Sequence, residues 1–243
     1  MSDVIFGQHD PKTIEQFRDV ASRAEKAALM ADGHVGYVMP IGGVAAYDNK
    51  ASVVGVGFDI ACGNAAIRTD LEVEHFDRKL FEHLAGEIQR SISFGVGRKN
   101  ESHDAPVDDP LFSASEWEAL KDTAGTHEHD TFKRKAREQL GTVGSGNHYV
   151  DVFADETGAI WVGVHFGSRG FGHSIASGFL SLAQNQRWGE RAREGEVLLD
   201  LSTPLGDAYW NLMGLAGRYA YTGREWVARE VVRILGGAGR ELV

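Results

Sequence analysis

The chain has 243 residues, of which 42% are hydrophobic, so it is long and apolar enough to bury a sizeable core. Its formal net charge of −10 opposes nonspecific binding to nucleic acid, because such binding depends on Lys and Arg neutralising phosphates. A nucleic-acid function would therefore need metal cations or a local basic surface. The single cysteine, Cys62, excludes an intramolecular disulfide and favours a reducing, cytoplasmic setting.

Two groups of basic residues can supply such a surface, although solvated helix faces are the ordinary interpretation of both. They are Lys133, Arg134, Lys135 and Arg137, followed by Arg187, Arg191 and Arg193. No run approaches the roughly 18 apolar residues of a membrane span, and the N-terminus lacks the pattern of a secretory signal. The sequence therefore predicts a soluble protein with no membrane contact.

The first half of the chain predicts helices separated by a glycine-rich segment. Asp10 and Pro11 are typical of a helix start, and the apolar spacing that follows predicts a helix to about Met30. Residues 31–63 favour short strands and tight loops. Residues 64–73 are predicted as a strand and residues 76–92 as a helix, whose expected inner face is Leu80, Phe81, Leu84 and Ile88.

The second half begins with a polar segment, residues 95–110, which is the best candidate for a disordered loop. A capping box at Ser115 and Glu118 predicts a short helix, and residues 132–140 predict another that Gly141 ends. Residues 148–166 form two β-rich runs around a turn, which indicates a hairpin. Helices are expected from about Ser174 and from Pro204 to Gly236, the last with a possible break at Gly223. We therefore expect an α+β or irregular α/β fold in a single domain over residues 1–243.

Four residues have the chemistry of metal ligands: Asp59 and Cys62 in VGFDIACGN, His148 in GSGNHYV and His165 in VHFGSRG. A carboxylate, a thiolate and imidazoles together suit a borderline metal such as Zn(II), Mn(II), Fe(II) or Co(II). The three-residue spacing of Asp59 and Cys62 lets both side chains lie on one side of a turn. Structural histidines and a buried cysteine are the alternative interpretation.

The hairpin predicts how the two histidines lie relative to one another. A turn symmetric about Glu156 and Thr157 places His148 directly opposite His165, with Cβ atoms roughly 4.5 to 5.5 Å apart. Both imidazoles could then reach one ion or an adjacent pair. A bulge in the turn would move one histidine to the opposite face of the sheet.

Two further segments carry possible phosphate contacts. The glycines before Asn147 in GTVGSGNH can turn backbone N–H groups towards a phosphate, although a tight turn before a strand explains them equally well. Ser168 and Arg169 precede a helix and can attract an anion, unless Arg169 is an ordinary surface arginine. For His34, which lies in the glycine-rich segment, we favour roles other than metal ligation.

Taken in order, ADGHVGYVMPIGGVAA, VGFDIACGNAAIRT, GTVGSGNHYVDV and VHFGSRGFGHSIA resemble the successive signature blocks of the RtcB family. These proteins are GTP-dependent ligases of tRNA splicing and RNA repair. The resemblance implies an α/β fold around a metal-binding cleft, two Mn(II) ions bridged by a cysteine, and a histidine that GTP guanylylates. It also implies ligation of an RNA 3′-phosphate or 2′,3′-cyclic phosphate to a 5′-hydroxyl.

Carried onto this sequence, the resemblance implies that Cys62 bridges the two ions, with Asp59 and His148 completing one site and His165 belonging to the other. Asn147 would contact the guanylate phosphate, Arg169 would help to bind the anion, and Asp151 would stand where the family usually has a Glu facing guanine. The substrate would be RNA ends.

The resemblance also has departures. The family's sequence continues beyond the last residue of this one, and that part supplies a further His ligand and the guanylylated His, so no catalytic residue is assigned here. The chain is therefore expected to be incomplete alone and to need a C-terminal half or a full-length ligase as partner. The alternative is a non-catalytic remnant or partner that binds metal and RNA ends.

Overall fold

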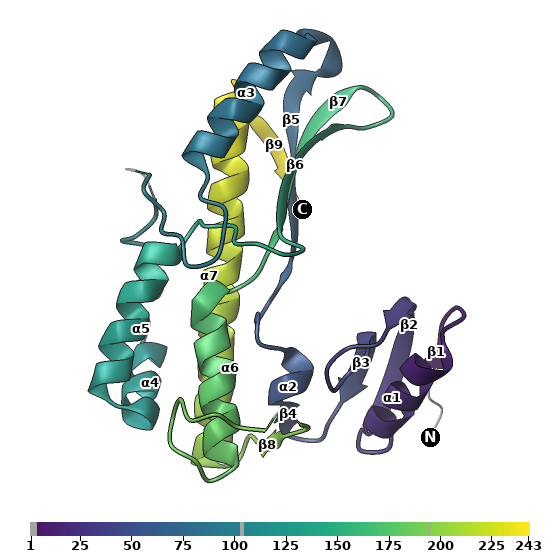
Figure 1. Cartoon of the computed structure of the whole chain (residues 1–243), viewed down its shortest axis with the longest axis vertical. Helices are drawn as coiled ribbons and strands as arrows, with labels where there is room; N and C mark the ends of the chain where they lie inside the picture. Colours follow the sequence, from purple (N-terminus) through teal and green to yellow (C-terminus); the bar gives the residue numbers. More distant parts are fainter. Residues whose placement is uncertain (1–3, 103–104, 194) are drawn as a thin grey trace. The chain divides into compact units, whose positions relative to one another are not determined.

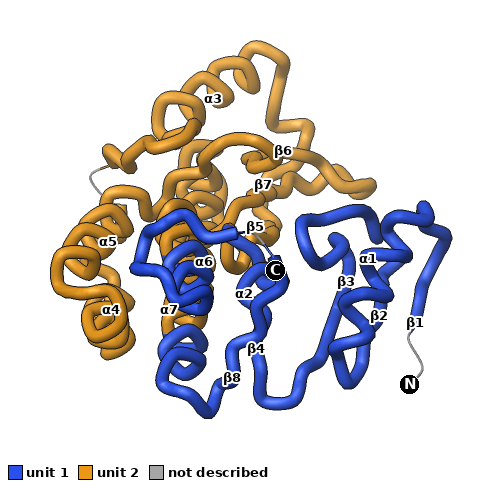
Figure 2. Tube along the Cα trace, turned by 60° about the horizontal axis from the view of Figure 1, so that its bottom comes forward, with its two compact units in different colours: residues 1–58, 175–211 blue, residues 59–174, 212–243 orange. Residues whose placement is uncertain are grey.

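The computed structural model describes residues 4–102, 105–193 and 195–243, and the chain forms two compact units. Unit 1 comprises Met1–Phe58 and Ile175–Asn211, and unit 2 comprises Asp59–Ser174 and Leu212–Val243 (Figure 2). Strands and helices occur in both units, which confirms the predicted mixed α+β class. The expectation of a single domain stays a prediction. Among the described residues, none of the helices combines the length and apolar character needed to cross a bilayer.

Unit 1 contains a three-stranded sheet of β1 (Val4–Ile5), β2 (Lys26–His34) and β3 (Ile41–Ala46), with α1 (Pro11–Ala21) beside it. It also contains α2 (Val53–Val56) and the pairing of β4 (Lys50–Ser52) with β8 (Leu198–Asp200). Asp10 caps α1 as predicted, by accepting hydrogen bonds from two backbone N–H groups.

The predicted extension of the first helix to Met30 is wrong, because β2 occupies residues 26–34. Ala27 and Leu29 are buried on one face of β2, where they pack with Phe17 and Ala21 of α1. These residues therefore form a paired strand with alternate burial, although the spacing of their apolar side chains also allows a helix.

Unit 2 is built on a four-stranded sheet in the order β6-β7-β5-β9 (Figure 1). Its strands are β5 (Gly63–Glu72), β6 (Tyr149–Ala154), β7 (Ala159–Phe166) and β9 (Gly239–Leu242), and β5 confirms the predicted strand at residues 64–73. One face of the sheet packs on α3 (Arg78–Ser91) and on α7 (Pro204–Leu235). The core between them includes Ile67, Ile88, Val162, Val164, Phe166, Val227 and Val231.

The predicted inner face of α3 is only half right. Ile88 is buried and Leu84 packs partly against the core, but Leu80 and Phe81 are 40% and 43% exposed. Packing against the sheet begins one turn further along the helix than the apolar pattern suggested. The first turn of α3 therefore leaves large apolar side chains accessible.

After η1 (Val73–His75) and α3, the polar segment forms a loop as predicted, although its residues 103 and 104, including His103, lie outside the described residues. η2 (Pro110–Ser113), α4 (Glu116–Ala124) and α5 (Thr126–Gln139) follow. The prediction of a capping box is wrong, because the backbone of Ser115 is already in the helical conformation and its side chain makes no capping hydrogen bond. α5 begins before the predicted Phe132, so the segment GTHEHD is largely helical, and Gly141 follows its end with φ +75°.

The start of one of the last two long helices and the continuity of the other differ from the predictions. α6 (Arg169–Ala183) begins before Ser174. α7 passes through Gly223 without a break. A Cβ on Gly223 would lie 3.4 Å from the Phe166 ring and 3.5 Å from the backbone of Gly141, which are ordinary contact distances, so the helix continues through this position without strain.

The hairpin of β6 and β7 is confirmed, but its predicted register is wrong by one residue. Tyr149, not His148, is paired with His165. Gly158 has φ +88°, and Asp155 accepts hydrogen bonds from the backbone N–H groups of Thr157 and Ala159. The connection thus has a glycine in the left-handed region and one residue more than the two-residue turn assumed from the sequence.

Candidate metal centre

Three segments of unit 2 bring the four predicted ligands together. The donor atoms of Asp59, Cys62 and His148 all lie within 4.8 Å of one another. The Cys62 sulfur is 3.6 Å from Nε2 of His148 and 3.4 Å from Nε2 of His165. Asp59 Oδ2 is 2.9 Å from Nε2 of His148. Three of the predicted ligands therefore form one group, and His165 joins it through the sulfur of Cys62.

The histidines converge although the predicted register is wrong. His148 precedes the first residue of β6, so the alternation of the pleated strand does not fix the direction of its side chain. His165 lies inside β7, on the same face as its partner Tyr149, and the two rings stack with centroids 5.5 Å apart. A turn closed by the hydrogen bond from Cys62 N–H to the Asp59 carbonyl brings the other two ligands to the same place.

The Asp59 carboxylate has the surroundings of a cation ligand. Both of its oxygens are buried, and neither has a donor in hydrogen-bond geometry among the described residues, although Oδ2 lies 2.9 Å from Nε2 of His148. A Cβ on Gly167 would lie 2.5 Å from Oδ1, so only glycine leaves room for the carboxylate there. A buried carboxylate without donors is costly unless a cation compensates it. This pocket therefore fits a bound metal ion.

Hydrogen bonds at the far side of each imidazole orient both Nε2 atoms towards Cys62. Nδ1 of His148 lies 2.9 Å from the carbonyl oxygen of Val143, and Nδ1 of His165 lies 2.8 Å from Oδ1 of Asn64. Oδ1 of Asn64 accepts a hydrogen bond from Nδ1 of His165, so the lone pair of this imidazole is on Nε2. Nδ1 of His148 faces both an acceptor, the Val143 carbonyl, and a donor, Nη1 of Arg169 at 3.0 Å, so these contacts orient the ring without fixing its tautomer. Tyr149 donates a second hydrogen bond to Asn64 Oδ1 over 3.1 Å, which fixes the amide.

We expect Asn64→Leu to weaken metal binding by roughly 10- to 100-fold, the usual cost of losing such an outer hydrogen bond. Leucine has a similar volume but cannot accept the proton on Nδ1 of His165, so this imidazole would no longer be held in one tautomer. Titration calorimetry with Mn(II) on the purified chain measures the effect. Asn64→Asp keeps the acceptor and should retain binding; equal losses in both variants would contradict the assignment.

The electrostatics of the centre favour a neutral Cys62 thiol and a neutral His165 imidazole in the absence of a cation. Although Cys62 is exposed as a residue, desolvation of its sulfur and the nearby Asp59 carboxylate raise the pKa of the thiol to about 11. Burial, followed by the neighbouring His148, lowers the pKa of His165. A divalent cation reverses the balance at the thiol, because it favours the thiolate directly.

Arg224 of α7 supports the centre and was not singled out from the sequence. It is 2% exposed, and its Nη1 donates hydrogen bonds to the carbonyls of Ala61 and Phe166, at 2.7 and 2.6 Å. The first carbonyl precedes Cys62 and the second follows His165. The sequence pattern that could have identified it is the position of an arginine on the apolar stripe of a helix, between the buried residues Ala220 and Val227.

Arg169 lies against the centre and is not an ordinary surface arginine. Its Nη1 is 3.0 Å from Nδ1 of His148, and its buried Nε has no partner among the described residues. A Cβ on Gly144 would lie 1.9 Å from Nη2, so this glycine of the GTVGSGNH loop makes room for the guanidinium. Ser168, by contrast, is fully buried and packs against Gly172, so its hydroxyl is not available to an anion at the surface.

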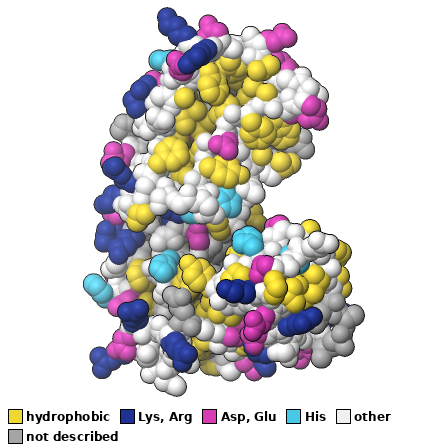
Figure 3. All heavy atoms as spheres, turned by 45° about the vertical axis from the view of Figure 1, so that its right-hand side comes forward, with side chains coloured by type: hydrophobic (Ala, Val, Ile, Leu, Met, Phe, Trp, Pro, Cys, Tyr) yellow, Lys and Arg dark blue, Asp and Glu magenta, His cyan; other side chains and the backbone are white. Residues whose placement is uncertain are grey.

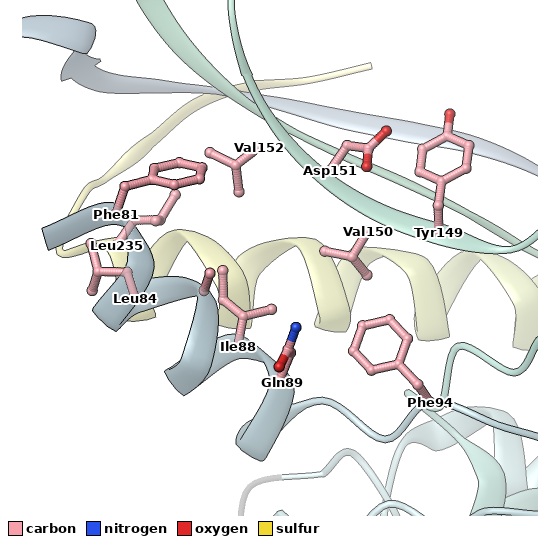
Figure 4. A pocket seen from close by; sticks show the side chains of 11 residues that line it. Phe81, Leu84, Ile88, Gln89, Phe94, Tyr149, Val150, Asp151, Val152 and Leu235 are labelled. Carbon is pink, nitrogen blue, oxygen red and sulfur yellow. The ribbon is translucent and has the colours of Figure 1, made fainter. Parts of the chain in front are cut away.

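The two residues expected at the guanylate occupy different positions relative to the centre. Nδ2 of Asn147 is 3.3 Å from Nε2 of His165, which places this amide at the centre. Asp151 lies further along β6 and lines an apolar pocket of about 510 Å³ with Phe81, Val150 and other residues. In Figure 4 its carboxylate points to the side of β6 opposite to Val150 and Val152, and the upper part of Figure 3 shows the surrounding hydrophobic surface.

His34 belongs to unit 1, where its Nδ1 lies 2.9 Å from the carbonyl oxygen of Asp32. Its role stays a prediction.

Comparison with known proteins gives one consistent result. A family model described as tRNA-splicing ligase RtcB matches residues 14–241. A tRNA-splicing ligase RtcB of Thermococcus kodakarensis is 31% identical over 90% of this chain and 54% of its own length. That of Archaeoglobus fulgidus is 30% identical over 92% and 56%, and the RNA-splicing ligase RtcB homolog 2 of Entamoeba dispar is 30% identical over 85% and 47%. The chain thus spans about half the length of the curated relatives it matches.

Proposed function

Because the chain belongs to the RtcB family, we propose that it forms the metal-binding part of an RNA ligase that uses GTP and Mn(II). The reaction would join an RNA 3′-phosphate or 2′,3′-cyclic phosphate to a 5′-hydroxyl. The chain would act together with a second polypeptide, either a C-terminal half or a full-length ligase. The cytoplasmic setting inferred from the single cysteine belongs to the same proposal.

The observation that carries the proposal is the convergence of Asp59, Cys62 and His148 within 4.8 Å, with Nε2 of His165 3.4 Å from the sulfur. A thiolate approached by two imidazoles suits two ions that share it. Asp59 and His148 would hold one ion, and His165 would contribute to the second. Two divalent cations would stabilise charge on a transferred phosphoryl group and orient the attacking oxygen.

The remaining residues would bind the nucleotide and the RNA end. Arg169, whose Nη1 lies 3.0 Å from Nδ1 of His148, would donate hydrogen bonds from its guanidinium to a phosphate at the centre. Asn147 would donate its amide N–H to the guanylate phosphate, since the amide lies 3.3 Å from His165. Asp151 would accept hydrogen bonds from guanine, because its side chain is exposed and points away from the apolar Val150 and Val152 of β6 (Figure 4).

Labelled GTP provides the test. The purified chain is incubated with Mn(II), first alone and then with a polypeptide that corresponds to the other half of an archaeal relative. Ligase function predicts a guanylyl adduct that is labile to acid and stable to hydroxylamine, together with sealing of a 3′-phosphate RNA to a 5′-hydroxyl RNA in the mixture. Asp59→Asn serves as the matched negative, because it keeps the shape of the side chain but removes its charge.

A non-catalytic protein that binds metal and RNA ends is the second candidate, since the three-donor cluster can hold an ion without any nucleophilic histidine. This function predicts Mn(II) binding without an adduct, both in the chain alone and in the mixture. An adduct on the chain alone excludes this candidate. A chain that binds no Mn(II) contradicts both.

A further inference from the structure

A second cavity of unit 2, of about 510 Å³, lies between α5 and the first turn of α6. Its charged lining is Lys99, Arg134, Lys135 and Glu138, with His173 beside them. Three cations thus face one carboxylate, in a chain whose formal net charge is −10. A concentration of positive charge against the overall balance is the electrostatic footprint of an anion site.

Internal ion pairs neutralise only part of this charge. Glu138 accepts from Lys99 and from Arg134, both at 3.1 Å. Lys135 forms no ion pair within the part of the chain that the structure describes, and it is exposed. The cavity therefore retains a net positive charge that an anionic ligand can neutralise.

The basic run of α5 divides into two pairs with different surroundings. Lys133 lies over the Trp117 ring and Arg137 over the Phe112 ring, with the cationic groups 5.4 and 5.2 Å from the ring centres. These two interactions attach α5 to α4 and η2. Arg134 and Lys135 instead line the cavity. One pair thus has a packing role, and the other faces an open space.

The cavity adjoins the metal centre along the chain. Gly170 lines it, and the N–H of Gly170 donates to Oε1 of Gln139 over 3.3 Å. The preceding residue, Arg169, contacts His148 of the centre. If the end of an RNA strand lies at the metal centre, the phosphates next to that end would therefore lie towards the cavity. The ring of Phe132 in the same lining provides an apolar surface for a base.

We propose that this cavity binds internal phosphates of a single-stranded RNA whose end occupies the metal centre. Arg134 and Lys135 supply the charge, and Lys99 exchanges part of its interaction with Glu138 for the phosphate. The choice of RNA rests on the proposed function, whereas the choice of a polyanion rests on the cavity itself.

Fluorescence anisotropy with a labelled, unstructured RNA of twelve nucleotides tests the proposal, in the absence of Mn(II) and GTP. The variant is Arg134→Gln with Lys135→Gln. The matched control is Lys133→Gln with Arg137→Gln, which removes the same charge from the same helix. We expect the first pair to weaken binding by about 10-fold and to lower the salt dependence by roughly 0.7 for each phosphate that is no longer neutralised. The control pair should change affinity by less than about twofold.

Equal losses of affinity in the two pairs, with circular dichroism and urea denaturation showing that both remain folded like the wild type, would overturn the proposal, since only net charge would then matter. No binding by the wild type at low salt would also overturn it. RNA that ends in a 3′-hydroxyl should depend on the cavity as strongly as RNA that ends in a 3′-phosphate; dependence confined to the 3′-phosphate would mean that the cavity holds the terminal group instead. Mn(II) stoichiometry, measured separately, reports on the centre, so a failure here leaves the proposed function standing.

Discussion

Replacing Cys62 with alanine is expected to remove most of the bound metal while leaving the fold intact. The sulfur is the atom that both imidazole Nε2 atoms approach, at 3.6 and 3.4 Å, so its removal takes a ligand from both of the proposed ion sites. The decrease in affinity should exceed the roughly 10- to 100-fold typical of an outer hydrogen-bond partner. Stability should change little, because Cys62 is exposed and belongs to no core cluster of the described residues.

Metal content per chain after dialysis against Mn(II), measured by mass spectrometry, checks this prediction, with circular dichroism as the test of folding. Cys62→Ser keeps the size of the side chain but offers a poorer ligand, so it should bind less metal than the wild type. His83→Ala is the matched control, because it removes an exposed imidazole of α3 outside the donor cluster. Unchanged metal content in Cys62→Ala would remove the basis of the site.

The ligand set could be predicted from the sequence because its chemistry is local. Asp59 and Cys62 are three residues apart, and a single turn brings them together. The convergence of His148 and His165 was predicted for the wrong reason. The assumed turn symmetry fails at Gly158, and His148 reaches the centre only because it lies before β6, where no ladder fixes its direction. Hairpin register depends on loop length, and a glycine in the left-handed region is typical of a three-residue loop, which the assumption of a two-residue turn overlooked.

Long-range packing accounts for the elements that sequence reasoning missed. β9 pairs with β5, which is far from it in the sequence, and the residues of β9, Gly239–Leu242, show no strand pattern of their own. Residues 26–34 allow a helix by spacing and become a strand because β3 pairs with them. Local propensity is a weak guide where a partner strand decides the outcome. The fold class could be predicted from the sequence because the β5 strand and the β6–β7 hairpin have strong local patterns.

Arg224→Met is expected to lower the free energy of unfolding by about 2–6 kcal/mol, because it removes the donor from two buried carbonyls at a cost of about 1–3 kcal/mol each. The guanidinium is 2% exposed and satisfies two carbonyls, those of Ala61 and Phe166. Methionine fills much of the volume but donates no hydrogen bond, so both oxygens would stay buried without a donor. These carbonyls flank Cys62 and His165, so metal affinity should fall as well.

Urea denaturation of the metal-free chain isolates the structural part of this effect. Arg229→Met is the matched control, because it lies on the same helix and pairs with Glu225 on the exposed face, at 2.8 Å. An exposed pair contributes only about 0–1 kcal/mol, so the control should unfold almost like the wild type. Arg224→Lys keeps a charge with a single donor point and should fall between the two. If Arg224→Met and Arg229→Met unfolded at the same urea concentration, the two carbonyl hydrogen bonds would not hold the ligand loop, and the centre would owe its geometry to the sheet alone.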